Sequence, residues 1–298
     1  MSGVVSVWTI GGRGRRLSPE RSASVCAHPS QPGRRFLPFE YTAKVKRPTE
    51  HYLLHGVIGY DLIVTALAYA PLSARPVWLV ACLAIYIAAF FATYEIGYFE
   101  NDRVAAARET TPTQSLSFAD QSSRFSPVTG WIWGLTLGAA GAALQSFIQI
   151  NGPLVPADPS WPVAFTTNWG LITTLQVVTR LAFYGFNHSD PASRLTAMLV
   201  MQLARVLGYA LLFSISLVGA ALCVSHALAR WAAYAAYRAG GDRHRLQLHH
   251  MTFLIFVGIA MAILITDAPA LVGHAAQALL IILYLAARAL RDLARRVD

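Results

Sequence analysis

Charged side chains are scarce in this chain. Asp, Glu, Lys and Arg together make up 13% of the 298 residues, whereas hydrophobic residues make up 55%. Soluble globular domains carry roughly 25% charged residues, so this composition and the positive mean hydropathy lie outside their usual range. We therefore exclude an ordinary soluble protein and predict a polytopic integral membrane protein.

Cysteine is also rare. The three cysteines, Cys26, Cys82 and Cys223, are far apart in the sequence, and the last two lie in apolar segments. There they are expected to behave as small hydrophobic residues. The spacing predicts neither a disulfide framework nor a zinc site.

Acidic residues are outnumbered, 15 against 24 Lys and Arg, so the formal net charge is +9. A basic chain is sometimes a nucleic-acid binder, but here the basic residues lie in the termini and in loops that we place on one side of a membrane. This distribution follows the positive-inside rule of membrane proteins. We therefore expect membrane lipid as a partner and no nucleic acid.

The amino-terminal segment, 1–47, has no sustained apolar period and is rich in Arg, Ser, Pro and Gly. We predict that it is a disordered basic arm, drawn to anionic lipid headgroups, and that the transmembrane helical domain is 48–298. The apolar run at 3–10 is too short for a signal peptide and precedes the charges, so no cleavage is expected.

Beyond the arm, long apolar runs predict an all-α transmembrane bundle of about eight spans. The run at 194–237 is too long for one crossing, so we expect the chain to fold back near 216–219. The expected spans are about 51–72, 76–98, 130–150, 163–186, two within 194–237, 251–265 and 271–290. The Gly- and Ala-rich third span is suited to close helix packing.

Loop charges then predict the topology. One set of connections contains nearly all the loop Lys and Arg residues, and the other set contains only Arg75. By the positive-inside rule both termini are cytoplasmic, and we expect a bacterial inner-membrane protein. The basic set comprises the arm, the loops at 99–127, 187–194 and 238–250, and the carboxyl tail.

Acidic and amide side chains follow the second span, in the segment YEIGYFENDRVAAARE at 94–109. At helical spacing Glu95, Tyr98 and Asp102 lie on one face. Oxygen ligands grouped at the mouth of a bundle suit a hard cation such as Mg²⁺, which in turn would hold a phosphate-bearing substrate. The alternative is that a transmembrane helix simply ends in polar residues at the water boundary.

The residues after the second span also resemble a known motif. The sequence NDRVAAARE is similar to the Asn-Asp-x-x-Asp-x-x-x-Asp motif of the UbiA superfamily of intramembrane prenyltransferases. Asn101 and Asp102 match its first two positions, and Glu109 is a conservative match to the last. Ala105 stands at the central Asp, which is a departure from the family pattern.

A second acidic motif follows the sixth helix of that family on the same face. Here Asp242 matches its first acid, and Leu246 stands where the next acid would be. Members of the family usually have nine helices and a Tyr-x-x-x-Lys sequence after the fourth, and this chain departs from both features. The resemblance therefore lies mainly in the topology of the helices over roughly 50–290, and only a few residues match the family's motifs.

The resemblance implies a UbiA-like transferase that acts on an isoprenoid diphosphate or a polyprenyl phosphate with Mg²⁺. Asn101, Asp102, Glu109 and Asp242 would bind the metal, and Asp102, Glu109 and Arg205 would take part in catalysis. Two of the family's acids are missing here. We therefore expect the site to use one metal ion, or cations of the protein, to bind the phosphate.

Two arginines lie inside predicted spans, where a charge costs about 2.5–3.5 kcal/mol on insertion scales. Arg180 and Arg205, with Arg243 and Arg245 of a cytoplasmic loop, are candidates for holding a phosphate.

Glu95 and Tyr98 complete the expected substrate-binding set. For Arg180 the alternative is snorkelling to the nearby interface, and for Arg205 it is an internal salt bridge with Asp61 or Glu95.

Other functions are also open. His51, His55 and the histidines of 244–250 loosely resemble the boxes of membrane di-iron enzymes, but such sites need about eight histidines. A non-enzymatic subunit that binds lipid or assembles with partners is the main alternative, because Ala105 and Leu246 weaken the metal motif. A transporter is less favoured, since no inverted repeat is evident.

Overall fold

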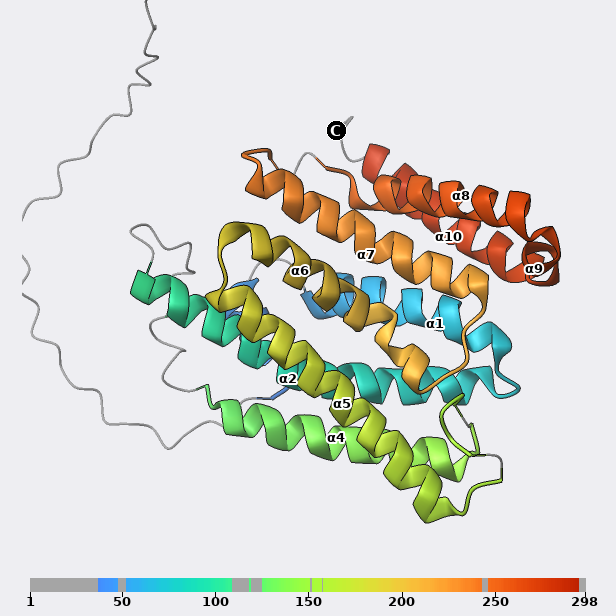
Figure 1. Ribbon diagram of the computed structural model, residues 1–298, viewed down its shortest axis with the longest axis horizontal. Coiled ribbons are helices and arrows are strands. Elements are labelled where there is room, and N and C mark those ends of the chain that lie inside the picture. Colours follow the sequence, from blue (N-terminus) through green and yellow to red (C-terminus); the bar gives the residue numbers. More distant parts are fainter. Residues whose placement is uncertain are drawn as a thin grey trace, which may run out of the picture. The chain divides into compact units, whose positions relative to one another are not determined.

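The structure is a computed structural model that describes residues 37–47, 52–108, 118, 125–150, 152–156, 158–242 and 246–294. Within these residues every regular element is a helix and no strand occurs (Figure 1). The predicted all-α class is therefore confirmed for the described part of the chain.

The first helical segments are short. They are η1 (Thr42–Lys46), η2 (Leu53–Leu62), α1 (Ile63–Tyr69) and η3 (Ala70–Leu72). The longer elements that follow are α2 (Pro76–Arg108), α4 (Pro127–Phe147), α5 (Trp161–His188), α6 (Pro191–Val206), η4 (Gly208–Leu211), α7 (Leu217–Arg238), α8 (Leu248–Thr266), α9 (Ala268–Gly273) and α10 (Ala275–Ala294).

Helix beginnings are marked by proline and by capping side chains. Proline stands in the first turn of α4, α5 and α6, where its missing N–H has no helical partner to lose. The Asp190 carboxylate accepts from two backbone N–H groups at the start of α6, and the Ser216 hydroxyl accepts from Gly219 N–H at the start of α7. The long apolar run therefore folds back close to 216–219, as predicted.

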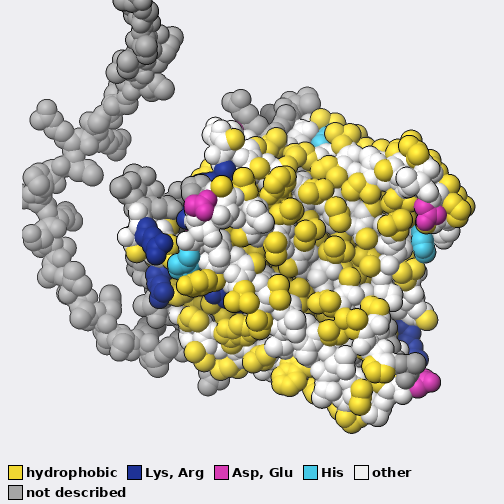
Figure 2. All heavy atoms as spheres, viewed as in Figure 1, with side chains coloured by type: hydrophobic (Ala, Val, Ile, Leu, Met, Phe, Trp, Pro, Cys, Tyr) yellow, Lys and Arg dark blue, Asp and Glu magenta, His cyan; other side chains and the backbone are white. Residues whose placement is uncertain are grey.

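Four helical stretches are long and apolar enough to cross a membrane, judged by length and composition: Leu53–Leu72, Pro76–Arg108, Leu217–Arg238 and Leu248–Thr266. Figure 2 shows hydrophobic side chains over the middle of the visible face and charged side chains near its two ends. Both observations support a membrane protein. Helices occupy the other predicted spans too, but whether each crosses the membrane, and hence the number of about eight spans, stays a prediction.

The second span differs from its prediction. We expected it to end near 98 and to be followed by a loop, but α2 continues to Arg108. The segment after the apolar run contains no Gly or Pro between 98 and 108 and includes three consecutive alanines, which favour helix. The described motif residues therefore lie on a helix rather than in a loop.

The amino-terminal boundary also differs. Residues 37–47, which we assigned to a disordered arm, pack against α2, and the side chains of Tyr41, Thr42 and Val45 are fully buried. The helical unit therefore begins before residue 48. Apolar residues spaced four apart anchor this segment in a small cluster with Ile96. The remainder of the predicted arm, 1–36, lies outside the described residues.

α2 packs against α4 and α5, while α7 packs against α1, α6 and α8, and α10 packs against α8 (Figure 1). Glycines allow α4 to approach α2 closely, as its composition predicted. A Cβ added at Gly134 would lie 2.6 Å from Thr93, and one at Gly141 would lie 2.7 Å from the Tyr86 ring.

Candidate functional site

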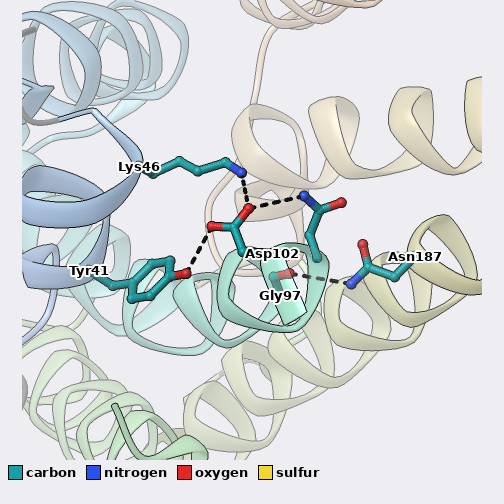
Figure 3. Close-up of polar contacts among 6 residues, drawn as sticks. Tyr41, Lys46, Gly97, Asp102 and Asn187 are labelled. Carbon is teal, nitrogen blue, oxygen red and sulfur yellow. Dashed lines mark hydrogen bonds and ion pairs between the residues drawn. The ribbon is translucent and has the colours of Figure 1, made fainter. Parts of the chain in front are cut away.

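The acid Asp102 lies near the end of α2 and is buried. Tyr41 donates its phenol proton to Oδ2 over 2.8 Å, and the Lys46 ammonium contacts Oδ1. The Asn101 amide lies 3.5 Å from the same Oδ1 atom. Figure 3 shows the Tyr41 and Lys46 side chains pointing to the Asp102 carboxylate from the amino-terminal segment. Both carboxylate oxygens are therefore already bonded within the protein.

A second acid of α2 holds the same segment. The Glu95 carboxylate accepts from the backbone N–H of Thr42 over 2.7 Å and is buried. One turn earlier along α2, the Phe91 and Phe39 rings are 5.2 Å apart. The predicted shared face of Glu95 and Asp102 is thus confirmed, and residues 39–46 run along it.

Lys46 provides a cation at this face. Its side chain is 26% exposed and that of Asp102 is 5% exposed. The ammonium also lies 6.0 Å from the centroid of the Tyr98 ring. Burial, and then the Asp102 charge, raise the pKa of Tyr41 above its usual value, so the phenol stays a donor. An ammonium has three N–H donors, and Asp102 takes one of them.

The opposite side of α2 faces α5. Arg180 Nη2 lies 3.0 Å from Glu100 Oε2, and Asn187 donates its amide N–H groups to Gly97 O and to the same glutamate, each over 3.3 Å. The Arg180 Nη1 and Asn187 Oδ1 atoms are buried and have no hydrogen-bond partner among the described residues. Arg180 is therefore paired with an acid of α2.

Arg205 forms a buried ion pair with Asp61. Its Nε and Nη2 atoms lie 2.7 and 2.5 Å from the two carboxylate oxygens, and Nη2 also donates to the Tyr52 hydroxyl over 3.1 Å. The guanidinium carbon lies 4.8 Å from the Phe91 ring centroid. Of the two partners predicted, the structure selects Asp61, and Glu95 binds elsewhere. The charge of Arg205 is therefore balanced inside the bundle.

Aromatic rings line α2 just before its acids. The Tyr94 ring centroid is 4.9 Å from that of Phe183 and 5.1 Å from that of Tyr98. The Tyr98 and Phe183 centroids are 5.6 Å apart. These rings form an aromatic wall between α2 and α5, next to the polar end of α2. Tyr98 therefore lies against both Phe183 and Lys46.

Several predicted site residues lie elsewhere. Asp242 is exposed just beyond the end of α7. Glu109, Arg243 and Arg245 lie outside the described residues. Among the residues that the structure describes, no three His, Cys, Asp or Glu side chains come together as metal ligands.

The predicted Mg²⁺ ion does not fit the arrangement at Asp102. Mg²⁺ needs nearly octahedral oxygen coordination and is usually bound through one or two carboxylates and several waters. Here a phenol and an ammonium occupy the two oxygens of Asp102. A metal would have to displace Lys46.

The residues that complete this site lie outside the set predicted from the sequence. Tyr41, Thr42 and Lys46 fell within the predicted arm, and Glu100 was not considered as a partner. The signal was the apolar spacing of FLPFEYTAKV at 36–45, which is typical of a packed segment.

A pocket of about 350 Å³ lies at the other end of α2, lined among others by Tyr69, Arg75, Gln149 and Phe213. Its separation along the 33-residue helix places it away from the acids.

Comparison with protein-family models, with curated proteins and with solved structures finds no match for this chain. The resemblance to the UbiA superfamily therefore rests on the motif and on the order of the helices.

Proposed function

We propose that this chain is a UbiA-like integral membrane transferase that acts on an isoprenoid diphosphate or a polyprenyl phosphate. In this proposal the ammonium of Lys46 provides the positive charge that a metal ion would otherwise provide beside Asp102. The observation that carries it is the contact between Lys46 and Asp102, on the face of α2 that Glu95 and Asp102 share.

Lys46 suits this role because its charge is fixed in place but remains accessible. Asp102 orients the ammonium, and about a quarter of the side chain is exposed. Two of its three N–H donors are then available to the oxygens of a phosphate.

The proposed reaction is transfer of the isoprenyl group. The bond from the allylic carbon to the bridging oxygen breaks, and its electron pair leaves with the diphosphate, whose charge Lys46 stabilises. The allylic cation then faces the ring faces of Tyr94, Tyr98 and Phe183, which attract positive charge. The acceptor's nucleophile forms the new bond and loses its proton to solvent.

The isoprenyl chain would lie in the apolar part of the bundle or in lipid, as the mean hydropathy of α2 suggests. No step in this proposal uses Mg²⁺, because the oxygens of Asp102 are bonded to Tyr41 and Lys46.

A second candidate is a non-catalytic membrane subunit that binds lipid or assembles with partners. It is favoured by the observation that Glu95 and Asp102 both hold residues 41–46 in place, which is a structural role. Ala105 and Leu246, at positions where the family has acids, agree with it.

Binding of prenyl diphosphates and polyprenyl phosphates to the purified full-length protein in detergent tests the proposal. We expect binding to persist in EDTA and to weaken about tenfold in Lys46→Gln, since a charge-assisted hydrogen bond is worth about 1.5–3 kcal/mol. Lys44→Gln is the matched control, because that side chain is 52% exposed and lies two residues away. Binding that requires Mg²⁺ and ignores Lys46 would overturn the role of the ammonium.

Release of diphosphate in the presence of a membrane-lipid acceptor separates the two candidates. Binding with release supports the transferase. Binding that depends on Lys46, with no release of diphosphate for any acceptor tested, supports the lipid-binding subunit.

A further inference from the structure

A second polar cluster lies between η2, α7, α8 and α10, apart from the acids of α2. At its centre is the Tyr60 ring, on which the His249 ring stacks with centroids 4.8 Å apart. The guanidinium carbons of Arg230 and Arg288 lie 4.8 and 5.1 Å from the centroid of the same tyrosine ring. Two cations from α7 and α10 therefore share one aromatic ring.

Among the described residues, the carboxylate that contacts this cluster is Asp292, and it is engaged by histidine. Asp292 Oδ2 lies 2.6 Å from His249 Nδ1, and Arg288 Nε donates to His249 Nε2 over 2.9 Å. Because an arginine can only donate, Nε2 accepts, and the ring proton stands on Nδ1 facing the aspartate. His249 is thus neutral in this arrangement and adds no charge.

The two guanidiniums have no direct acidic partner among the described residues. Among the described residues, no salt bridge joins Arg230 or Arg288 to a carboxylate. Asp61, the residue after Tyr60 in η2, gives both of its oxygens to Arg205. The cluster therefore contains two guanidinium charges and one carboxylate that contacts neither of them directly.

Two polar atoms here also lack partners. Arg230 Nε and His226 Nε2 are buried and make no hydrogen bond to any described residue. His226 is 4% exposed, and its ring centroid lies 5.7 Å from that of Tyr60. Buried polar atoms are normally hydrogen-bonded, so each unpartnered atom requires an explanation. An acceptor-rich anion beside Tyr60 would provide one for Arg230.

We propose that Arg230 and Arg288 bind a phosphate group beside Tyr60, at a site separate from Asp102 and Lys46. A phosphate oxygen pair matches the planar fork of a guanidinium, and two such forks suit one tetrahedral anion. The aromatic ring packs against both arginines and holds them before the ligand arrives. Bringing in the anion also removes the repulsion between the two cations.

The phosphate can belong to a lipid headgroup or be free in solution. Exposed large hydrophobic side chains on the same two helices favour the lipid. Leu254 of α8 is 64% exposed and Leu290 of α10 is 65% exposed, which suits contact with acyl chains. An anionic lipid would place its headgroup phosphate on the arginines and its chains along these helices.

The test uses the full-length protein, purified in a neutral detergent and stripped of lipid. Binding is measured for dioleoyl phosphatidic acid, for dioleoyl phosphatidylcholine and for inorganic phosphate. We expect saturable binding of phosphatidic acid, weakened about tenfold in Arg230→Gln and in Arg288→Gln because each loses a charge-assisted contact.

The matched control is Arg238→Gln, an exposed arginine two turns after Arg230 on α7, which should bind as the unchanged protein does. Lys46→Gln should also leave this binding unchanged, which separates the site from that of the proposed function. Circular dichroism shows whether each variant is folded. If Arg230→Gln does not fold, Arg288→Gln still tests the site, because Arg288 is only half-buried.

Saturable binding of phosphatidic acid alone supports a lipid headgroup, and saturable binding of inorganic phosphate as well shows that the phosphate group suffices. Absence of saturable binding for every phosphate probe overturns the proposal. So does an affinity that is the same in both arginine variants as in Arg238→Gln.

Discussion

Removing one partner of the buried pair between Arg205 and Asp61 should destabilise the protein strongly. The two guanidinium nitrogens lie 2.7 and 2.5 Å from the carboxylate oxygens, and both side chains are at most 3% exposed. Charges about 4 Å apart attract by about 4 kcal/mol at an effective dielectric constant of about 20. In Asp61→Asn the guanidinium keeps only neutral partners, including Tyr52, so we expect a loss of about 3–5 kcal/mol.

The double replacement makes the reasoning sharper. Arg205→Met with Asp61→Leu removes both charges and leaves apolar side chains, which in other buried pairs costs much less than a single removal. We therefore expect the double variant to be more stable than either single variant, with a coupling free energy of about 2–4 kcal/mol. The exposed pair of Lys44 and Glu40 provides a control, and Lys44→Gln should cost about 0–1 kcal/mol.

The measurement is unfolding of the purified protein by SDS in mixed micelles, followed by tryptophan fluorescence. A cost below about 1 kcal/mol for Asp61→Asn would show that the pair is screened by water. A double variant whose loss equals the sum of the single losses would show that the two charges do not interact.

Three further changes test other contacts. Gly97→Ala should lower the melting temperature, because its Cβ would lie 2.3 Å from the Phe183 ring, whereas Gly170→Ala, with nothing within 4 Å, should be neutral or stabilising. Gln145→Leu should cost about 2–3 kcal/mol in the same unfolding assay, because it leaves buried partners without hydrogen bonds. Hydrogen bonds from Ser193 and its neighbours at the α6 amino terminus lower the pKa of Asp190. The Asp190 carboxylate therefore stabilises the folded protein above its unfolded-state pKa, and this stabilisation is lost as the pH falls through its folded-state pKa. The hydrogen-exchange protection factors of the first turn of α6, which are corrected for the intrinsic pH dependence of exchange, should therefore fall in acid, and an Asp190→Ala variant should show no such change.

Composition and local period were enough to predict much of this protein. A low charged fraction and long apolar runs predict helices where α2, α4, α5, α7 and α8 occur, because a backbone in lipid must satisfy its hydrogen bonds within the helix. The 3.6-residue period places Glu95 and Asp102 on one face, and the structure confirms it. The depth of Arg205 in an apolar run also predicted an internal partner.

Partner choice, in contrast, was decided only by the tertiary structure. Arg205 lies 144 residues from Asp61 in sequence, and Lys46 lies 56 residues from Asp102. No local pattern distinguishes Asp61 from Glu95 as the partner of an arginine. The choice depends on how the helices are placed around one another.

The two arginines around Tyr60 illustrate the same limit. The arginines lie on α7 and α10 and the tyrosine lies on η2, so the three residues are separated in sequence by long stretches of chain, and each arginine alone is an ordinary basic side chain in the second half of a helix. Packing brings the two guanidiniums to one ring, without a salt bridge to any described carboxylate. Local sequence thus determines which segments are helical and apolar, because those properties act over a few residues. Only the assembled bundle determines which charges meet, because that depends on distances between helices.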